Sequence, residues 1–307
     1  PEEFVSNSQL TVESIARLKQ EATDNYEKYW ADLARQEIQW FSPFSEILNE
    51  RKAPNYTWFA DGKLNASYNC LDVNVSKNPG KTAIIFEGEN GDVSTLTYAD
   101  LLIEVCRFSN GLLSLGVQPL DRVIIYMPMV PEAIIAMQAC ARIGAVHSVV
   151  FGGFSAKAMR DRIQDANASL VITADGGYRG GQVIPLKEST DTALQENCDS
   201  VKHVVVLQRA QNKIPMKQDR DIWWHELVEG QDETCEAVSV SSEHPLFILY
   251  TSGSTGKPKG IQHSTSGYLL GAKLTNKWVF DLAQDDVFWC TADVGWVTGH
   301  SYVTYGP

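Results

Sequence analysis

Residues 250–260, YTSGSTGKPKG, have the composition expected of a phosphate-binding loop. The glycines let the backbone approach a ligand closely, and the hydroxyls and lysines can contact the oxygen atoms of a polyphosphate. We expect phosphate contacts from Thr251, Ser252, Gly253, Ser254, Thr255, Gly256 and Lys257. The segment is not a Walker loop, because Pro258 rather than Ser or Thr follows its first lysine. A flexible surface linker is the alternative, although linkers rarely carry two lysines around a proline directly after an apolar strand.

Two further glycine-rich segments also follow apolar, strand-like runs. Phe151, Gly152 and Gly153 follow one run, and residues 175–181 follow the next. Taken singly, each could be a tight turn into a helix. If the strands are parallel, however, their carboxyl ends meet at one edge of the sheet, where ligands bind in such folds. Arg179 is the only arginine of residues 175–181 and is placed to reach a phosphate.

Residues 293–302, DVGWVTGHSY, mix bulky and small side chains in a way that suits a narrow apolar slot. Trp296 read alone is more typical of a core residue than of a ligand platform. His300 could serve as a base, but we expect it to have a positioning or structural role. The sequence has no Ser/His/Asp or Cys/His arrangement that would support nucleophilic catalysis by the protein.

Apolar runs alternating with helical patterns predict the elements that hold these segments. Continuous Val/Ile runs separated by helices are typical of parallel strands covered on both faces, so the sequence predicts an α/β fold with doubly wound, mainly parallel sheets and flanking helices. A hairpin comes first, formed by strands at 83–86 and 93–97. A helix from Thr97 to Leu115 follows, with Thr97 and Asp100 as its capping pair. The expected strands are 122–127, 146–151, 170–173, 203–207 and 245–250, and the expected helices 131–143, 155–166 and 183–197.

The first part of the chain is organised differently. Apolar residues at helical spacing predict one amphipathic helix over 12–35, with Thr11 as its cap. An aromatic, irregular segment follows, which we interpret as anchors for an extended lead-in rather than as a stacking surface for nucleic acid. The predicted division is a helical and extended lead-in over 1–75, packed on a main domain that starts at 76 and continues to 307.

Composition restricts the class of protein. The net charge of −12 argues against a protein that binds nucleic acid over a broad surface. Six cysteines without CxxC pairs fit reduced, mostly buried thiols better than zinc ligands or disulfides, so we expect a cytoplasmic protein. Residues 1–10 lack a secretory signal pattern. The longest apolar stretch, 133–154, is interrupted by polar residues and Gly144, which argues against a membrane span.

The phosphate-loop sequence resembles that of the adenylate-forming acyl-CoA ligases. Residues 58–72, WFADGKLNASYNCLD, and 289–307, WCTADVGWVTGHSYVTYGP, narrow the resemblance to the acetyl-CoA synthetases and their short-chain relatives, and FSPF at 41–44 and VVFGGFSAKAMRDRI at 149–163 extend it over nearly the whole chain. The resemblance implies an incomplete N-terminal domain of such an enzyme, without the C-terminal lid domain and its catalytic lysine. The fragment alone is therefore expected to be inactive, and no catalytic residue is assigned within it.

The resemblance also implies substrates and site residues. The expected activity is that of an AMP-forming acetate–CoA ligase that uses acetate, ATP with Mg²⁺, and coenzyme A. Coenzyme A is expected at Phe151, Gly152, Gly153, Arg179, Gln182, Ile184, Pro185 and Thr298, and the acyl pocket at Val297 and Thr298. Gln182 is a departure, because the family often has a second arginine there. A propionyl-CoA or other short-chain acyl-CoA synthetase, and a noncatalytic nucleotide- or CoA-binding or interaction domain, are the alternatives.

Overall fold

The computed structural model describes residues 8–251 and 258–307, and its centre is one seven-stranded sheet. The strand order is β12-β11-β8-β6-β7-β14-β15, parallel throughout except for β15, which is antiparallel to β14. The strands of this sheet are β6 (Arg122–Tyr126), β7 (Val146–Val149), β8 (Leu170–Ala174), β11 (His203–Leu207), β12 (Asp221–Trp223), β14 (Pro245–Thr251) and β15 (Lys259–Ser264). The predicted α/β class and the five predicted central strands are confirmed.

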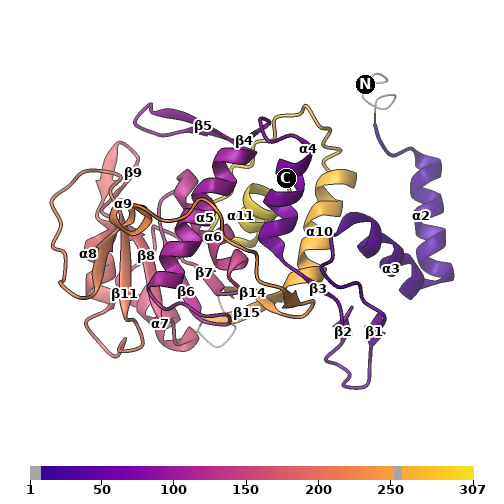
Figure 1. Ribbon diagram of the computed structural model, residues 1–307, viewed down its shortest axis with the longest axis horizontal. Coiled ribbons are helices and arrows are strands. Elements are labelled where there is room, and N and C mark those ends of the chain that lie inside the picture. Colours follow the sequence, from indigo (N-terminus) through magenta and orange to yellow (C-terminus); the bar gives the residue numbers. More distant parts are fainter. Residues whose placement is uncertain (1–7, 252–257) are drawn as a thin grey trace.

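Helices cover both faces of this sheet (Figure 1). From β6 the chain crosses through α6 (Pro131–Arg142) to β7, then returns through α7 (Ala156–Ala166) to β8 on the other side of β6. Because such crossovers are right-handed, the reversal of direction puts α6 and α7 on opposite faces. The helix α8 (Leu186–Ala193) packs against α7, whereas α5 (Tyr98–Ser114) packs against α6 and α9 (Trp224–Val228). The sheet is therefore doubly wound.

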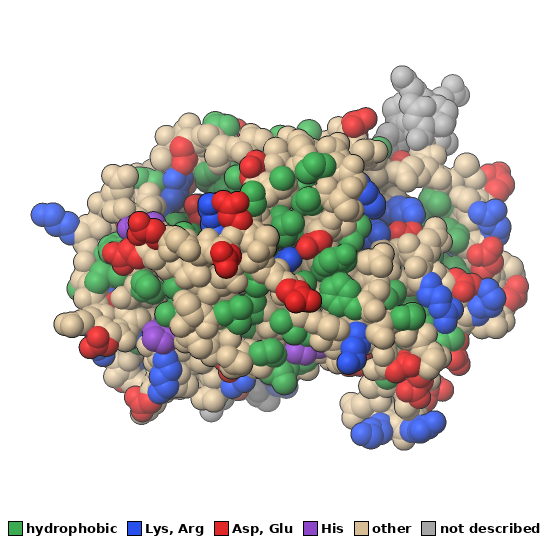
Figure 2. Space-filling view, in the orientation of Figure 1, with side chains coloured by type: hydrophobic (Ala, Val, Ile, Leu, Met, Phe, Trp, Pro, Cys, Tyr) green, Lys and Arg blue, Asp and Glu red, His purple; other side chains and the backbone are tan. Residues whose placement is uncertain are grey.

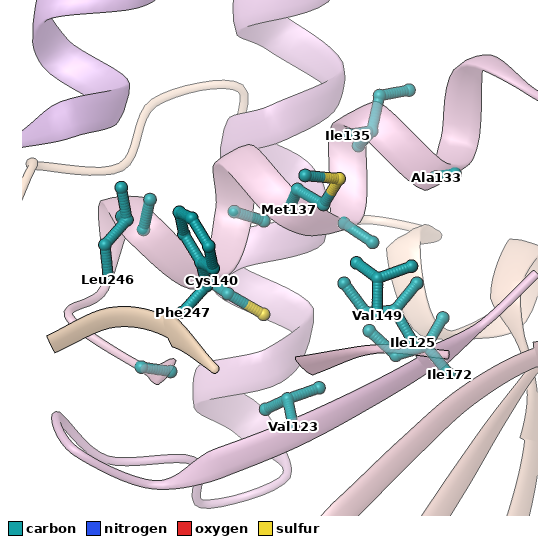
Figure 3. Close-up of a cluster of buried hydrophobic side chains, with 14 of the residues drawn as sticks. Val123, Ile125, Ala133, Ile135, Met137, Cys140, Val149, Ile172, Leu246 and Phe247 are labelled. Atoms are coloured by element: carbon teal, nitrogen blue, oxygen red, sulfur yellow. The ribbon is translucent and has the colours of Figure 1, made fainter. Parts of the chain in front are cut away.

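The main core lies between α6 and the sheet (Figure 3). Met137 and Cys140 of α6 lie over Val123 and Ile125 of β6, and all four side chains are fully buried. Phe247 of β14 extends the same cluster. Burying one large apolar side chain contributes about 1.5–3 kcal/mol. This packing therefore holds in place the strands whose carboxyl ends carry the candidate site.

Smaller elements complete the main part of the chain. They are α4 (Val73–Lys77), β4 (Thr82–Glu87), β5 (Val93–Thr97), β9 (Gly177–Arg179), β10 (Gln182–Ile184), β13 (Val240–Ser241), α10 (Thr265–Trp278), α11 (Val297–Gly299) and a π-helix, η2 (His300–Tyr305). The predicted hairpin and capping arrangement are confirmed, because β4 pairs with β5 and the Thr97 hydroxyl accepts from the Asp100 amide while Asp100 accepts from Thr97.

Two of the predicted helices are wrong in part. The pattern over 12–35 forms two helices, α2 (Val12–Asp24) and α3 (Tyr26–Glu37), because the Asn25 side chain accepts from the Lys28 amide and starts a new helix. Thr11 caps α2 as predicted. The helix expected over 183–197 is only α8, because Gln182–Ile184 form the strand β10 and Pro185 precedes the helix.

The lead-in segment contacts the main part through buried and half-buried polar groups. It contains α2 and α3, β1 (Leu48–Asn49), β2 (Thr57–Trp58), β3 (Lys63–Leu64) and the π-helix η1 (Tyr68–Asp72). The amide of Asn65, which is fully buried, donates to the carbonyls of Ala141 and Val238, 2.9 Å away in each case. Asp72 accepts both branches of the Arg142 guanidinium, at 2.8 and 3.0 Å. Such partners fix the segment more precisely than apolar contact alone.

The far end of the molecule, formed by α2 and α3, is polar (Figures 1 and 2). Acidic and basic side chains are interspersed there, and α2 has no buried residue. Of the aromatic residues predicted as anchors, Phe44 and Phe59 are buried and Tyr56 is exposed. All six cysteines are free thiols, and Cys106, Cys140, Cys198 and Cys235 are buried, as the composition predicted. Within the described ranges, no helix combines the length and apolar character that crossing a membrane requires.

Candidate functional site

The candidate site lies at the carboxyl edge of the sheet, where the winding direction changes between β6 and β8. Ligands of doubly wound sheets bind at such a switch point. The segments after β6 and β8 approach closely here, because a Cβ added to Gly177 would lie 2.9 Å from the Cβ of Pro128. Gly152, after β7, is also in a tight position, since its Cβ would lie 3.3 Å from the Met127 carbonyl oxygen. Glycine at these positions lets three strand ends meet.

Arg179 and the Phe151–Gly153 segment come together at this edge. The Arg179 guanidinium lies over the Phe151 ring, 4.8 Å from its centroid, which is within the range of a cation–π interaction. A Cβ at Gly153 would lie 2.5 Å from Arg179 Nη1, so a larger residue would displace the guanidinium. Arg179 is exposed, and none of the ion pairs found among the described residues includes it. A phosphate can therefore approach it.

Arg179 and Gln182 belong to one short hairpin. They are paired directly opposite each other in β9 and β10, and both are exposed. Gly180 and Gly181 form the turn, with φ of 60° and 73°, a conformation that glycine adopts without strain. Directly opposite side chains in an antiparallel pair project to the same face, so Gln182 occupies the position next to Arg179. Ile184 is half-buried at the end of β10, and Pro185 is exposed before α8.

The segment 293–299 lies near Phe151 and near Phe154, which follows shortly after it in the chain. The Trp296 ring is 6.2 Å from that of Phe151 and 6.3 Å from that of Phe154. A Cβ at Gly295 would lie 3.0 Å from the Phe151 backbone nitrogen, so the two segments touch. Burial raises the pKa of Asp293, although its hydrogen bond from the Gly295 amide and the charge of Arg179 act in the opposite direction. The structure thus joins the two predicted CoA segments with the predicted acyl segment.

Two expectations for this segment have different outcomes. Trp296 is 51% exposed, so the interpretation of this residue as core is wrong. Its position beside Phe151 comes from a long-range contact that its own sequence neighbours do not indicate. His300 is fully buried, its pKa is lowered to about 3 by burial, and it is therefore neutral at physiological pH. That agrees with a structural role.

Val297 and Thr298 form the first turn of α11 next to Trp296. Both side chains are exposed, Val297 to 48%. Met129 was not identified from the sequence, yet its sulfur accepts from the Val294 amide at 3.3 Å and it joins the segment after β6 to this one. Met127, Pro128 and Met129 directly follow the buried strand β6, at the switch point of the sheet. That position after a strand is the sequence signal from which Met129 could have been identified.

The predicted phosphate loop is only partly described. Ser252, Gly253, Ser254, Thr255, Gly256 and Lys257 lie outside the described residues. Thr251 is the last residue of β14 and is exposed. Just before it, the Tyr250 hydroxyl donates to Asp165 of α7 at 2.6 Å, and the Arg162 guanidinium lies 5.3 Å from the Tyr250 ring centroid. The strand that leads into the loop is therefore tied to α7.

The described ranges contain no group of three or more His, Cys, Asp or Glu side chains arranged to hold a metal ion. The predicted Mg²⁺ is not assigned to any described side chain.

Comparison with known proteins covers the whole chain. Residues 71–307 match a family model described as AMP-binding enzyme, and residues 15–70 match one described as acetyl-coenzyme A synthetase N-terminus. A protein of Methylobacillus flagellatus named acetyl-coenzyme A synthetase is 61% identical over 93% of this chain and 44% of its own length. A protein of the same name from Chromobacterium violaceum is 58% identical over 100% of this chain and 47% of its own length. The chain thus spans a little under half the length of these curated relatives, and it belongs to the family of AMP-binding enzymes.

Proposed function

We propose that this chain is the N-terminal part of an AMP-forming acetate–CoA ligase. The observation that carries the proposal is the convergence of Phe151, Arg179 and Trp296 at the switch point of the sheet. It is supported by relatives named acetyl-coenzyme A synthetase, which are 58% and 61% identical to this chain. The substrates would be acetate, ATP and coenzyme A.

The reaction would proceed in two steps. A carboxylate oxygen of acetate attacks the α-phosphorus of ATP, and the bond from that phosphorus to the bridging oxygen breaks to release pyrophosphate. The CoA thiolate then attacks the carbonyl carbon of acetyl-AMP, and AMP leaves with the bond electrons while acetyl-CoA forms. Neither step requires a nucleophile from the protein, so the contribution of this part of the chain is binding and charge stabilisation.

Each candidate segment would have one task. Thr251 through Lys257 would hold the β- and γ-phosphates and stabilise charge on the leaving pyrophosphate. Mg²⁺ would enter as part of the ATP substrate, bound to its phosphates. Phe151, Gly152, Gly153, Arg179, Gln182, Ile184, Pro185 and Thr298 would bind CoA, and Val297 with Thr298 would line the acyl pocket. Among these, Arg179 is the exposed cation suited to a CoA phosphate.

We also propose the division of the chain predicted from the sequence, with a lead-in over 1–75 and the first part of an ATP- and CoA-binding domain from 76. The contacts that the buried Asn65 and the half-buried Asp72 make with the main part support a lead-in that packs on that domain. The free thiols favour the reducing cytoplasm as the location. The acidic net charge disfavours nucleic acid as a partner.

The proposal is tested on the full-length protein by exchange of labelled pyrophosphate into ATP, with acetate and with propionate as the acid. We expect exchange that depends on acetate and exceeds that with propionate, and acetyl-CoA formation once CoA is added. Lys257→Ala should impair exchange, because it removes a cation from the leaving group. Absence of acid-dependent exchange in the full-length protein would overturn the proposal, and a preference for propionate would replace acetate as the substrate.

A further inference from the structure

The turn of the β4–β5 hairpin, residues 88–92, contacts the hairpin that carries Arg179. In the ribbon view the β4–β5 hairpin extends from the body of the molecule towards β9 (Figure 1). The Gly181 amide, in the β9–β10 turn, donates to Glu89 Oε1 at 2.6 Å. These two residues are 92 positions apart in the sequence, so the contact ties together two separate hairpins.

Arg209 provides a second connection between the same hairpins. Its guanidinium donates to both carboxylate oxygens of Asp92, and to Asn90 Oδ1 at 3.0 Å. The same guanidinium lies 5.5 Å from the ring centroid of Phe86 in β4 and 5.3 Å from that of Tyr178 in β9. Arg209 is therefore held between the two hairpins, next to the residue that precedes Arg179.

The backbone of Arg209 is fixed as firmly as its side chain. Asp175 is fully buried at the end of β8, and its Oδ1 accepts from the amides of Arg209 at 2.7 Å and Ala210 at 2.9 Å. The same oxygen accepts from the Gly176 amide at 2.7 Å. Asp175 thus joins the ends of β8 and β11 at the start of the segment that leads to Arg179. Arg209 consequently has a defined position relative to β9.

The β9–β10 hairpin requires support of this kind. It has three residues in each strand and two glycines in its turn. A two-stranded hairpin is at best marginally stable alone in water, and glycine loses the most conformational freedom on ordering. Without contacts from outside, Arg179 and Gln182 would sample many positions. A ligand that needs Arg179 in one position would then bind more weakly, since ordering the hairpin would cost binding free energy.

We propose that Arg209 and the β4–β5 turn are positioning elements that hold the Arg179 hairpin ready for the phosphate of a CoA-like ligand. The guanidinium of Arg209 is already occupied by Asp92 and Asn90, so it acts through the hairpin and not by contacting the ligand. The inference rests on the proposed function, because it concerns the CoA part of the same site.

The test uses the full-length enzyme and two variants that each break one connection, Arg209→Gln and Glu89→Ala. Each should raise the KM for CoA about three- to tenfold, as expected when a positioning contact and not the ligand contact is lost. Acetate-dependent exchange of pyrophosphate into ATP needs no CoA and should stay near the wild-type rate. Hydrogen exchange should become faster in the peptide that contains Gly181. Arg209→Lys keeps the charge but loses the forked geometry, so its KM should lie between those of wild type and Arg209→Gln.

Arg160→Gln is the matched control. The Arg160 side chain is exposed to 16% and pairs with Glu196, whereas that of Arg209 is exposed to 17% and pairs with Asp92. The hydrogen bonds and the ion pair of Arg160 connect α7 to the end of α8, and among the described residues none of them involves either hairpin. This variant should leave the KM for CoA unchanged.

Three results would overturn the proposal. An unchanged KM in both Arg209→Gln and Glu89→Ala, with a raised KM in Arg179→Ala, would reject the positioning role and leave the proposed CoA site intact. Equal losses of CoA use and pyrophosphate exchange would show that Arg209 supports the fold in general. An unchanged KM in Arg179→Ala itself would reject the CoA role of the hairpin, and the positioning role with it. Glu89 is exposed, so Glu89→Ala gives a result even if Arg209→Gln fails to fold.

Discussion

Arg179 and Lys187 lie close together in the sequence but in opposite environments. Arg179 is exposed at the tip of a hairpin, over the Phe151 ring. Lys187 is fully buried at the start of α8, where its ammonium donates to Asp191 at 2.6 Å and to the Pro215 carbonyl at 3.1 Å and lies 2.9 Å from Asp221. The three donors of Lys187 are matched by protein acceptors. The charge of Lys187 is thus matched within the protein, whereas the charge of Arg179 can be matched by a ligand.

The buried side of this comparison is a network of four charges. Arg220 bridges Asp191 and Asp221, at 2.5 Å from each. Burial disfavours the charged form of Asp221, but the hydrogen bonds from Arg220 and Lys187 outweigh it and hold the pKa of Asp221 below its usual range. A charge is tolerated inside this protein where partner groups surround it.

The largest expected effect follows from breaking this network. Lys187→Ala would leave Asp221 short of a partner, and removing one member of a buried ion pair costs about 3–5 kcal/mol. We expect a corresponding fall in the urea midpoint of unfolding. Lys157→Ala is the matched control, because Lys157 also pairs with an aspartate four residues on, at 2.7 Å, but its side chain is 77% exposed. The control should change stability by less than about 0.5 kcal/mol. Similar losses in the two variants would contradict the distinction by burial.

The exposed side of the comparison is tested by Arg179→Ala in the full-length enzyme. A charge-assisted contact to phosphate contributes about 1.5–3 kcal/mol, so the KM for CoA should rise by roughly one to two orders of magnitude. Pyrophosphate exchange driven by acetate should survive, and the urea midpoint should hardly change. Loss of both half-reactions would mean that Arg179 supports the fold instead.

Asp175 lies four residues before Arg179, and an ion pair between them would complicate the interpretation of Arg179→Ala. Its Oδ1 accepts from backbone amides of Gly176, Arg209 and Ala210. None of the ion pairs within residues 8–251 and 258–307 joins Asp175 to Arg179. The structure therefore gives no ion pair through which Arg179→Ala would destabilise this edge of the sheet.

Fully and partly buried histidines extend the comparison to a third kind of group. His147, His244, His263 and His300 all have a pKa lowered by burial, and none appears among the ion pairs of the described residues. His147 and His300, which are fully buried, therefore remain neutral in the folded protein. Unfolding exposes them to water, where their pKa returns to about 6.5. Between the folded and unfolded pKa values the unfolded chain binds more protons, so stability rises with pH there and is lost as pH falls below about 6.5.

We therefore expect the free energy of unfolding, followed through the urea midpoint, to be nearly constant above about pH 7 and to fall towards pH 5, with a slope that approaches about 1.4 kcal/mol per pH unit for each of His147 and His300. His300→Gln removes one titrating group, so the slope should become smaller whatever the absolute stability of the variant. An unchanged slope would mean that His300 is protonated in the folded state.

The fold was largely predictable because its signals are local. The strands β6, β7, β8, β11 and β14 are short apolar runs, and Thr97 with Asp100 is a capping pair read from adjacent residues. The sequence does not predict the hairpin β9–β10, although Gly180-Gly181 is a turn signal, because residues 183–197 fit a helical pattern. Likewise, the helical pattern runs through Asn25, and only the cap that its side chain forms divides α2 from α3.

The candidate site was predictable only residue by residue. Arg179 and the Phe151–Gly153 segment were identified by their positions after strands, which is a property of the sequence. The contacts of Arg179 and of Trp296 with Phe151 depend on how strands far apart in the chain are ordered in the sheet. The support that Arg209 gives to the Arg179 hairpin is of the same kind, because Arg209 and Asp92 are 117 positions apart. No local pattern encodes such pairs.

The smallest expected effect concerns Val297, an exposed apolar residue at the same edge as Arg179. Val297→Ala shortens the side chain and would enlarge the proposed acyl pocket in the full-length enzyme. A contact of this size changes discrimination between substrates by about 1–3 kcal/mol, and the 48% exposure of Val297 favours the lower end. The ratio of kcat/KM for propionate to that for acetate should therefore rise about fivefold. Val287→Ala is the control, since Val287 is 78% exposed and precedes the segment 293–299. An unchanged ratio in Val297→Ala would remove this residue from the acyl pocket and leave the CoA role of Arg179 untouched.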